Sequence, residues 1–167
     1  MNVVIAIIIL LGYTIALCIK GGGIPSSLSA SVFNLPKGWQ WVWTVVICSV
    51  CFLCVPTYTE KTGVNTQFLA FIAIAALGFV GAAPLVRNHK ELAYKVHCWA
   101  AVVCAVCSQL VLVFNQPWLL LCWVPFVAAF VWITKDDRWR TLVFWAEQVC
   151  FVSTFALCLI YKFVLCQ

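Results

Sequence analysis

Charged residues are scarce in this sequence. Asp, Glu, Lys and Arg together make up 9% of its 167 residues, whereas hydrophobic residues make up 65%. A typical soluble domain contains about 25% charged residues and about 45–50% apolar residues. Because so few charges cannot cover the surface of a water-soluble fold, lipid must surround most of the chain. The composition therefore predicts an integral membrane protein.

The apolar segments lack the alternation of apolar and polar residues that marks the strands of a membrane β-barrel. They are continuous, and six of them approach the ~20 residues that a helix needs to cross a ~30 Å hydrocarbon core. We therefore predict an all-α fold: a polytopic transmembrane helix bundle with six transmembrane helices, forming a single integral membrane domain over residues 1–167. The helices are expected at residues 3–19, 39–55, 66–86, 92–114, 118–134 and 141–165.

Two prolines mark expected boundaries between these helices. The second helix is expected to stop at Pro56, since proline removes a backbone donor from a helix interior. The connection from Asn115 to Pro117 is so short that the fourth and fifth helices should be antiparallel neighbours.

Basic residues are unevenly distributed between the two ends of the predicted bundle. The first, third and fifth loops share one side, which carries eight of the ten lysines and arginines: Lys20, Lys37, Arg87, Lys90, Lys95, Lys135, Arg138 and Arg140. By the positive-inside rule this side faces the cytoplasm and both termini lie outside. We expect the protein to be in the cell inner (plasma) membrane. No long basic run is present, so we expect the lipid bilayer and anionic lipid headgroups as partners, and no nucleic acid. The oligomeric state stays open.

Two ionisable residues, His97 and Glu147, fall inside predicted helices. Such residues are costly in a membrane and are functional candidates. They lie roughly 8 Å and roughly 10 Å from the same side and could meet if their helices pack together. The pair could handle protons or form half of a metal site. Alternatively, it could be a hydrogen bond that locks two helices, or the side chains could extend to the interface.

The loops on this side contribute further polar residues: His89, Asp136, Asp137, Ser27 and Ser29. Together with His97 and Glu147 they would form a cytoplasmic-side vestibule. We therefore predict, as the leading function, binding of a lipid or small molecule in this vestibule without classical catalysis.

Three other functions remain open. The protein could be an intramembrane lipid-modifying enzyme, metal-dependent or not, with His97 as base or ligand and a loop Asp or Ser assisting. It could be a proton-coupled small transporter, or a subunit that serves assembly alone. No HxxxH, HExxH or DxxxH spacing is present, and Gly21–Gly23 lacks the Lys-Ser/Thr ending of a nucleotide loop. The Cys-x-x-Cys spacings at residues 48–54 and 104–107 resemble metal sites but fit helix packing better, so no metal and no cofactor are expected. The eleven cysteines lie mostly in apolar runs, where thiols pack as small hydrophobic groups.

Several short motifs follow one another in a particular order along the chain. Residues 24–31 read IPSSLSAS, residues 78–81 read GFVG and residues 81–84 read GAAP. His97 then comes early in the fourth helix, and Glu147 lies in the last. This order resembles the six-helix DRAM-type membrane family (damage-regulated autophagy modulators) and uncharacterised integral membrane proteins of Bacteroidetes. The resemblance implies lipid homeostasis or membrane regulation, marks His97 and Glu147 for testing, and implies no defined catalytic activity.

Overall fold

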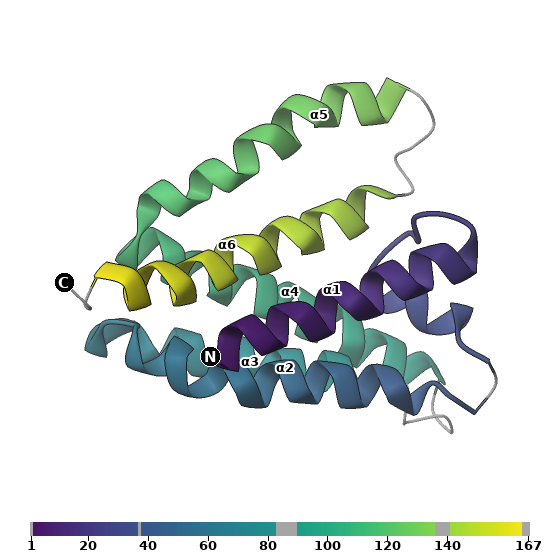
Figure 1. The fold of residues 1–167 in the computed structure, drawn as a ribbon, viewed down its shortest axis with the longest axis horizontal. Helices are drawn as coiled ribbons and strands as arrows, with labels where there is room; N and C mark the ends of the chain where they lie inside the picture. Colours follow the sequence, from purple (N-terminus) through teal and green to yellow (C-terminus); the bar gives the residue numbers. More distant parts are fainter. Residues whose placement is uncertain (1, 37, 83–89, 136–140, 165–167) are drawn as a thin grey trace.

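The computed structural model describes residues 2–36, 38–82, 90–135 and 141–164. Every regular element in this part of the chain is helical, which confirms the all-α prediction (Figure 1). The elements are α1 (Asn2–Gly21), η1 (Ser29–Asn34), α2 (Trp41–Glu60), η2 (Val64–Thr66), α3 (Gln67–Ala82), α4 (Lys90–Asn115), η4 (Pro117–Cys122), α5 (Trp123–Lys135) and α6 (Leu142–Val164), where η marks 3-10 helices.

Five of the helical segments are long and apolar enough to cross a membrane. They are α1, α2, η2 together with α3, α4 from Tyr94 onward, and α6. The sixth apolar stretch, Pro117–Phe130, is shorter and changes from the 3-10 geometry of η4 to the α geometry of α5. Large apolar side chains are exposed all around the bundle, among them Ile8, Phe52 and Phe71. Such a surface suits lipid rather than water, as expected for a multi-pass membrane protein.

The expected end of the second helix at Pro56 is wrong, because α2 continues to Glu60. Proline has no N–H, so the carbonyl of Phe52 loses its partner four residues on, but the fixed φ of proline is close to the helical value. Beyond this point the Thr59 hydroxyl donates to the Val55 carbonyl at 2.7 Å and supports the last turn. The loss of one backbone bond so near the end is therefore tolerated.

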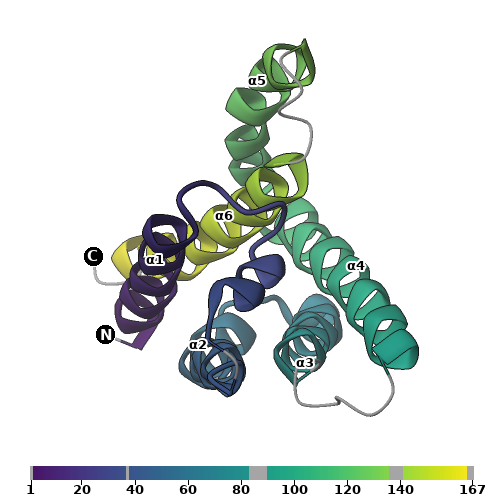
Figure 2. The same cartoon turned by 90° about the vertical axis from the view of Figure 1, so that its right-hand side faces the viewer.

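The expectation of one helix over residues 118–134, packed along the fourth helix, is also wrong. The segment divides into η4 and α5; α5 contacts η4 and α6 rather than packing along α4, and then diverges from the bundle (Figures 1 and 2). Pro125 is the third residue of α5, a position whose N–H has no partner inside a helix, so α geometry can begin there. The 3-10 turns between Asn115 and Trp123 redirect the chain away from α4.

The remaining helices form the packed part of the bundle, in which α3 contacts both α2 and α4, and α1 and α6 complete the packing. At the α2–α3 contact, the indole of Trp43 donates to the Val80 carbonyl at 3.3 Å and the Thr44 hydroxyl donates to the Gly81 carbonyl at 2.8 Å. A Cβ on Gly81 would lie only 2.8 Å from Ile47 Cγ2, so glycine sets the close approach of these helices.

A glycine turn ends α1 and reverses the chain. The N–H of Gly22 donates to the carbonyl of Ile19, and the N–H of Gly23 donates to the carbonyl of Cys18. Gly22 has a φ of 69°, which glycine adopts without steric cost. These two bonds and the left-handed residue form the Schellman motif that closes many helices. The turn directs the following segment back toward the bundle.

Candidate functional site

The segment that follows α1, residues 24–34, folds into one end of the bundle. Figure 2 looks onto this end and shows the segment surrounded by the ends of α1, α2, α3, α4 and α6. Leu28 and Ser31 are only 2% and 1% exposed, and Val32 is buried as well. We refer to residues 24–34 as the inserted loop. Its polar backbone needs partners at this depth, because buried N–H and C=O groups are costly when unpaired.

The inserted loop is bonded to the start of α6 at two points. The N–H of Leu28 donates to the Glu147 carboxylate at 2.5 Å. The N–H of Phe144, in the first turn of α6, donates to the carbonyl of Ser26 at 3.2 Å. Helix N-termini carry N–H groups without an intrahelical partner, and the loop supplies one. The loop and the start of α6 therefore satisfy donors on each other.

A row of hydroxyl groups connects the loop to α4. The Ser29 hydroxyl lies 3.0 Å from Nε2 of His97. The Ser27 hydroxyl lies 3.1 Å from the Ser29 hydroxyl and accepts the N–H of Ala30 at 2.9 Å. Ser27, Ser29 and His97 are all partly buried. The imidazole and two hydroxyls thus form a continuous hydrogen-bonded row at the edge of the bundle.

The His97 imidazole also interacts with the backbone carbonyl of Val80 near the end of α3. In the sequence, Pro84 follows Val80 by four residues and has no N–H, so a longer helix could not have satisfied this carbonyl. The Val80 carbonyl instead accepts from the Trp43 indole and faces His97. His97 therefore joins α4 to both the inserted loop and the end of α3.

His97 and Glu147 do come to the same end of the bundle, as their positions along the helices predict. Within the part of the chain that the structure describes, however, no hydrogen bond joins their side chains. They bind the adjacent loop residues Ser29 and Leu28 instead. In place of the direct bond between two helices, which was one of the alternatives, two bonds hold a loop between the helices.

Of the other residues predicted for the vestibule, His89, Asp136 and Asp137 lie outside the described residues. The described part of the site consists of Ser27, Ser29, His97 and Glu147. Across residues 2–36, 38–82, 90–135 and 141–164, no three His, Cys, Asp or Glu side chains are close enough together to hold a metal ion. The ten cysteines in these ranges are free thiols.

Sequence reasoning missed a second polar contact, deeper in the bundle. Gln109 of α4 accepts the Trp123 indole N–H at 2.9 Å, and its amide donates to the Ser153 hydroxyl of α6 at 3.3 Å. An amide inside an otherwise apolar run is a visible signal, but inside the predicted helices the candidates are limited to ionisable residues. Gln109 ties the start of α5 to the rest of the bundle.

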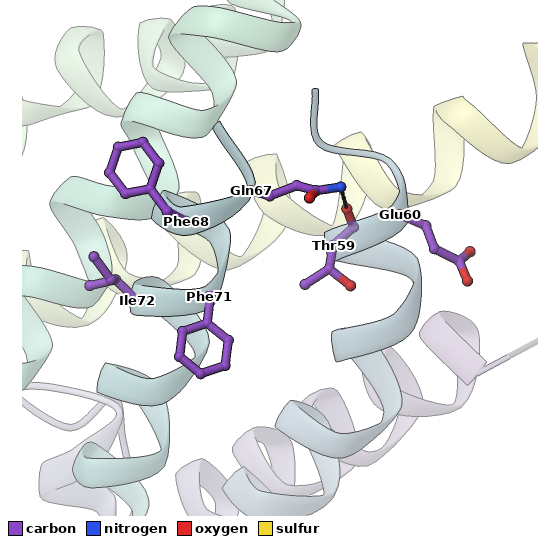
Figure 3. Close-up of a pocket in the computed structure, with 6 residues that line it drawn as sticks. All are labelled: Thr59, Glu60, Gln67, Phe68, Phe71 and Ile72. Carbon is purple, nitrogen blue, oxygen red and sulfur yellow. Dashed lines mark hydrogen bonds between the residues drawn. The ribbon is translucent and has the colours of Figure 1, made fainter. Parts of the chain in front are cut away.

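A groove of about 530 Å³ lies at the other end, between α2 and α3 (Figure 3). It is lined by Thr59, Glu60, Gln67, Phe68, Phe71 and Ile72. The amide of Gln67 donates to the Thr59 carbonyl at 3.3 Å and spans one side of it. Phe68 and Phe71 are exposed, so the groove opens onto the lipid-facing surface. No residue of this groove was expected to be functional.

Comparison with protein-family models, with curated proteins and with solved structures finds no match to this chain. The resemblance to the DRAM-type family therefore stays a prediction from the sequence. Function has to be inferred from the inserted loop and the side chains that hold it.

Proposed function

We propose that this protein is a six-span integral membrane protein that binds a lipid or small molecule at the inserted loop. The observation that carries the proposal is the burial of this polar loop between α4 and α6, held by His97 and Glu147. Backbone that leaves α-helical geometry, as residues 24–28 and the 3-10 helix η1 do, is tolerated at membrane depth where it is buried in protein or lines a cavity, and it commonly forms binding sites there. A simple connection between α1 and α2 would need neither the burial nor the anchoring side chains.

The directions of α4 and α6 support the sixth span. His97, near the start of α4, and Phe144, near the start of α6, both contact the inserted loop, so the two helices begin at the same end. The chain must then return across the full length of α4 between Asn115 and Leu142. The 3-10 helix η4 and α5, at ~2.0 Å and ~1.5 Å per residue, can together cover ~30 Å.

The distribution of basic residues supports a cytoplasmic position for the inserted loop and the third and fifth loops, in the cell inner membrane. Alkaline phosphatase and green fluorescent protein fused to the C-terminus test this directly. The phosphatase fusion should be active and the fluorescent fusion dark, because this topology places the terminus outside. A fluorescent fusion with an inactive phosphatase would reverse the orientation.

The chemistry of the site fits an amphiphile with an anionic headgroup. Lys20 at the end of α1, nearby in the sequence, adds positive charge that attracts a phosphate headgroup, and Ser29 and His97 provide polar groups at this end of the bundle. Exposed apolar side chains continue along α4 and α6 from this end, including Trp99 and Val143. The acyl chains of a bound lipid would lie against them.

Thermal unfolding of the detergent-purified protein, with and without added phosphatidylglycerol, tests this binding. A ligand at about 100 times its Kd stabilises the folded state by about 2.7 kcal/mol. We expect this stabilisation in the wild type and its loss in His97→Ala and Ser29→Ala. Phosphatidylcholine at the same concentration should stabilise less.

Glu60→Gln serves as the control, because Glu60 lines the groove at the opposite end of the bundle. It should keep the full response to phosphatidylglycerol. If Glu60→Gln loses the response while His97→Ala keeps it, lipid binds in the groove of Figure 3 and the proposed site is wrong.

A further inference from the structure

The hydrogen-bonded row at the inserted loop allows one direction that ends at the imidazole. The N–H of Ala30 can only donate, so the Ser27 oxygen is an acceptor and the Ser27 proton is free to point at Ser29. Ser29 can then accept from Ser27 and donate its own proton to Nε2 of His97 when that nitrogen carries no proton. In this arrangement each hydroxyl donates its hydrogen bond toward the imidazole.

The carbonyl of Val80 interacts with the same imidazole. A carbonyl oxygen only accepts, so it favours a proton on the imidazole nitrogen that faces it. The tautomer with its proton on Nδ1 leaves Nε2, which lies 3.0 Å from the Ser29 hydroxyl, as an acceptor. In this tautomer a serine hydroxyl donates to a neutral imidazole, the pairing that nucleophilic catalysis requires.

The Ser29–His97 pair also lies at a depth where it can reach the ester bonds of a membrane lipid. The candidate span of α4 begins at Tyr94, three residues after Glu91, and still includes the charged residue Lys95. His97 is three residues further along, or ~5 Å at 1.5 Å per residue. This places Ser29 near the boundary between headgroups and acyl chains, where the ester bonds of glycerolipids lie.

We propose that Ser29 and His97 form a catalytic dyad that hydrolyses an acyl ester of a membrane lipid, with Glu147 positioning the loop through Leu28. The inference rests on the proposed lipid site and names its reaction. Once the Ser29 oxygen has attacked, the Ser27 hydroxyl can rotate and donate its one proton to the ester oxygen on which negative charge develops, which is the usual task of an oxyanion donor.

The reaction balances with water as the only co-substrate. The Ser29 oxygen attacks the ester carbonyl carbon while Nε2 of His97 takes the hydroxyl proton. The carbon–oxygen bond to the glycerol side breaks, and His97 returns the proton to the departing alkoxide, leaving an acyl-serine and a free alcohol. Water then attacks the acyl-serine, giving its proton to His97, and Ser29 takes this proton back as the fatty acid leaves.

The test uses the full chain in detergent with a fluorescent fluorophosphonate, a probe that labels activated serines, followed by peptide mapping. We expect one label, on Ser29, and its loss in Ser29→Ala. His97→Ala should slow labelling by about 100-fold or more, the usual contribution of a general base. Ser26→Ala is the matched control, since Ser26 lies exposed in the same loop and its replacement should leave the labelling rate of Ser29 unchanged.

Release of fatty acid from phosphatidylglycerol liposomes provides the second measurement, and it should fall to background in Ser29→Ala. An unlabelled wild type, or a label on another serine, overturns the dyad whether or not any variant folds. If the wild type is unlabelled but still stabilised by phosphatidylglycerol, the dyad is wrong and the binding function stands. If both responses are absent, both proposals are wrong.

Discussion

Replacing Glu147 with alanine should release the inserted loop from α6. The carboxylate is the acceptor for the N–H of Leu28 at 2.5 Å, and the Leu28 side chain is 2% exposed. Without the carboxylate this backbone donor stays buried with no acceptor, or the loop must open to reach water. Glu147→Gln keeps one acceptor oxygen and should therefore have a smaller effect.

The size of the effect follows from the cost of an unpaired buried group, about 1–3 kcal/mol. A middle value of about 2 kcal/mol corresponds to about a 30-fold rise in the population of the open loop, since 1.4 kcal/mol is a factor of ten. If opening of the loop is coupled to global unfolding, the same energy lowers the Tm by about 4–8 °C for a chain of this size.

Hydrogen–deuterium exchange followed by mass spectrometry measures the loop directly. Peptides covering residues 24–32 should exchange about 30-fold faster in Glu147→Ala, while peptides from the middle of α3 keep their protection. Glu60→Ala is the control, because Glu60 is exposed at the opposite end of the bundle. Unchanged exchange over residues 24–32 in Glu147→Ala would contradict this prediction, because the bond would then not hold the loop in place.

Two further predictions concern the packing of the bundle. Gly81→Ala should lower the Tm, because its Cβ would lie 2.8 Å from Ile47 and overpacking of this kind costs about 1–3 kcal/mol; Gly78→Ala, which meets nothing within 4 Å, should be neutral or stabilising. Equal Tm values for the two variants would be incompatible with the close α2–α3 contact. A double-mutant cycle of Gln109→Leu and Trp123→Phe should give a coupling free energy of about 0.6 kcal/mol, which is typical of hydrogen bonds in membranes. Strictly additive changes in the free energy of unfolding would show that this hydrogen bond contributes nothing.

The two prolines discussed in the fold show why helix ends were harder to predict than helices. Pro56 ends a helix by the general rule, yet α2 passes through it, because one missing bond costs little near the end and the packing of α2 against its neighbours continues. Pro125 lies where a helix begins and costs nothing at all. Residue-by-residue rules identify prolines as positions where a helix can end. The packing of the surrounding helices decides whether the helix does end there.

Part of the candidate site is predictable from the sequence. His97 and Glu147 stand out because a charged or titratable group in an apolar run is rare, and Ser27 and Ser29 because they share the polar end with them. Gln109 went unnoticed, although its amide is equally out of place in lipid. The hydrogen-bond partners of these side chains could not be predicted, because each partner lies on a different helix or loop from the side chain that it binds.

The length and composition of the apolar runs are enough to predict the helical class and the positions of the two ionisable residues along their helices. Lipid offers no hydrogen bonds, so long apolar runs must satisfy their backbone as helices, and a rise of ~1.5 Å per residue then places every side chain along the bundle axis. That His97 and Glu147 hold a loop rather than each other depends on how the helices pack. Their partners lie 68 and 119 residues away in the sequence, and the burial of Leu28 between the helices brings them within reach.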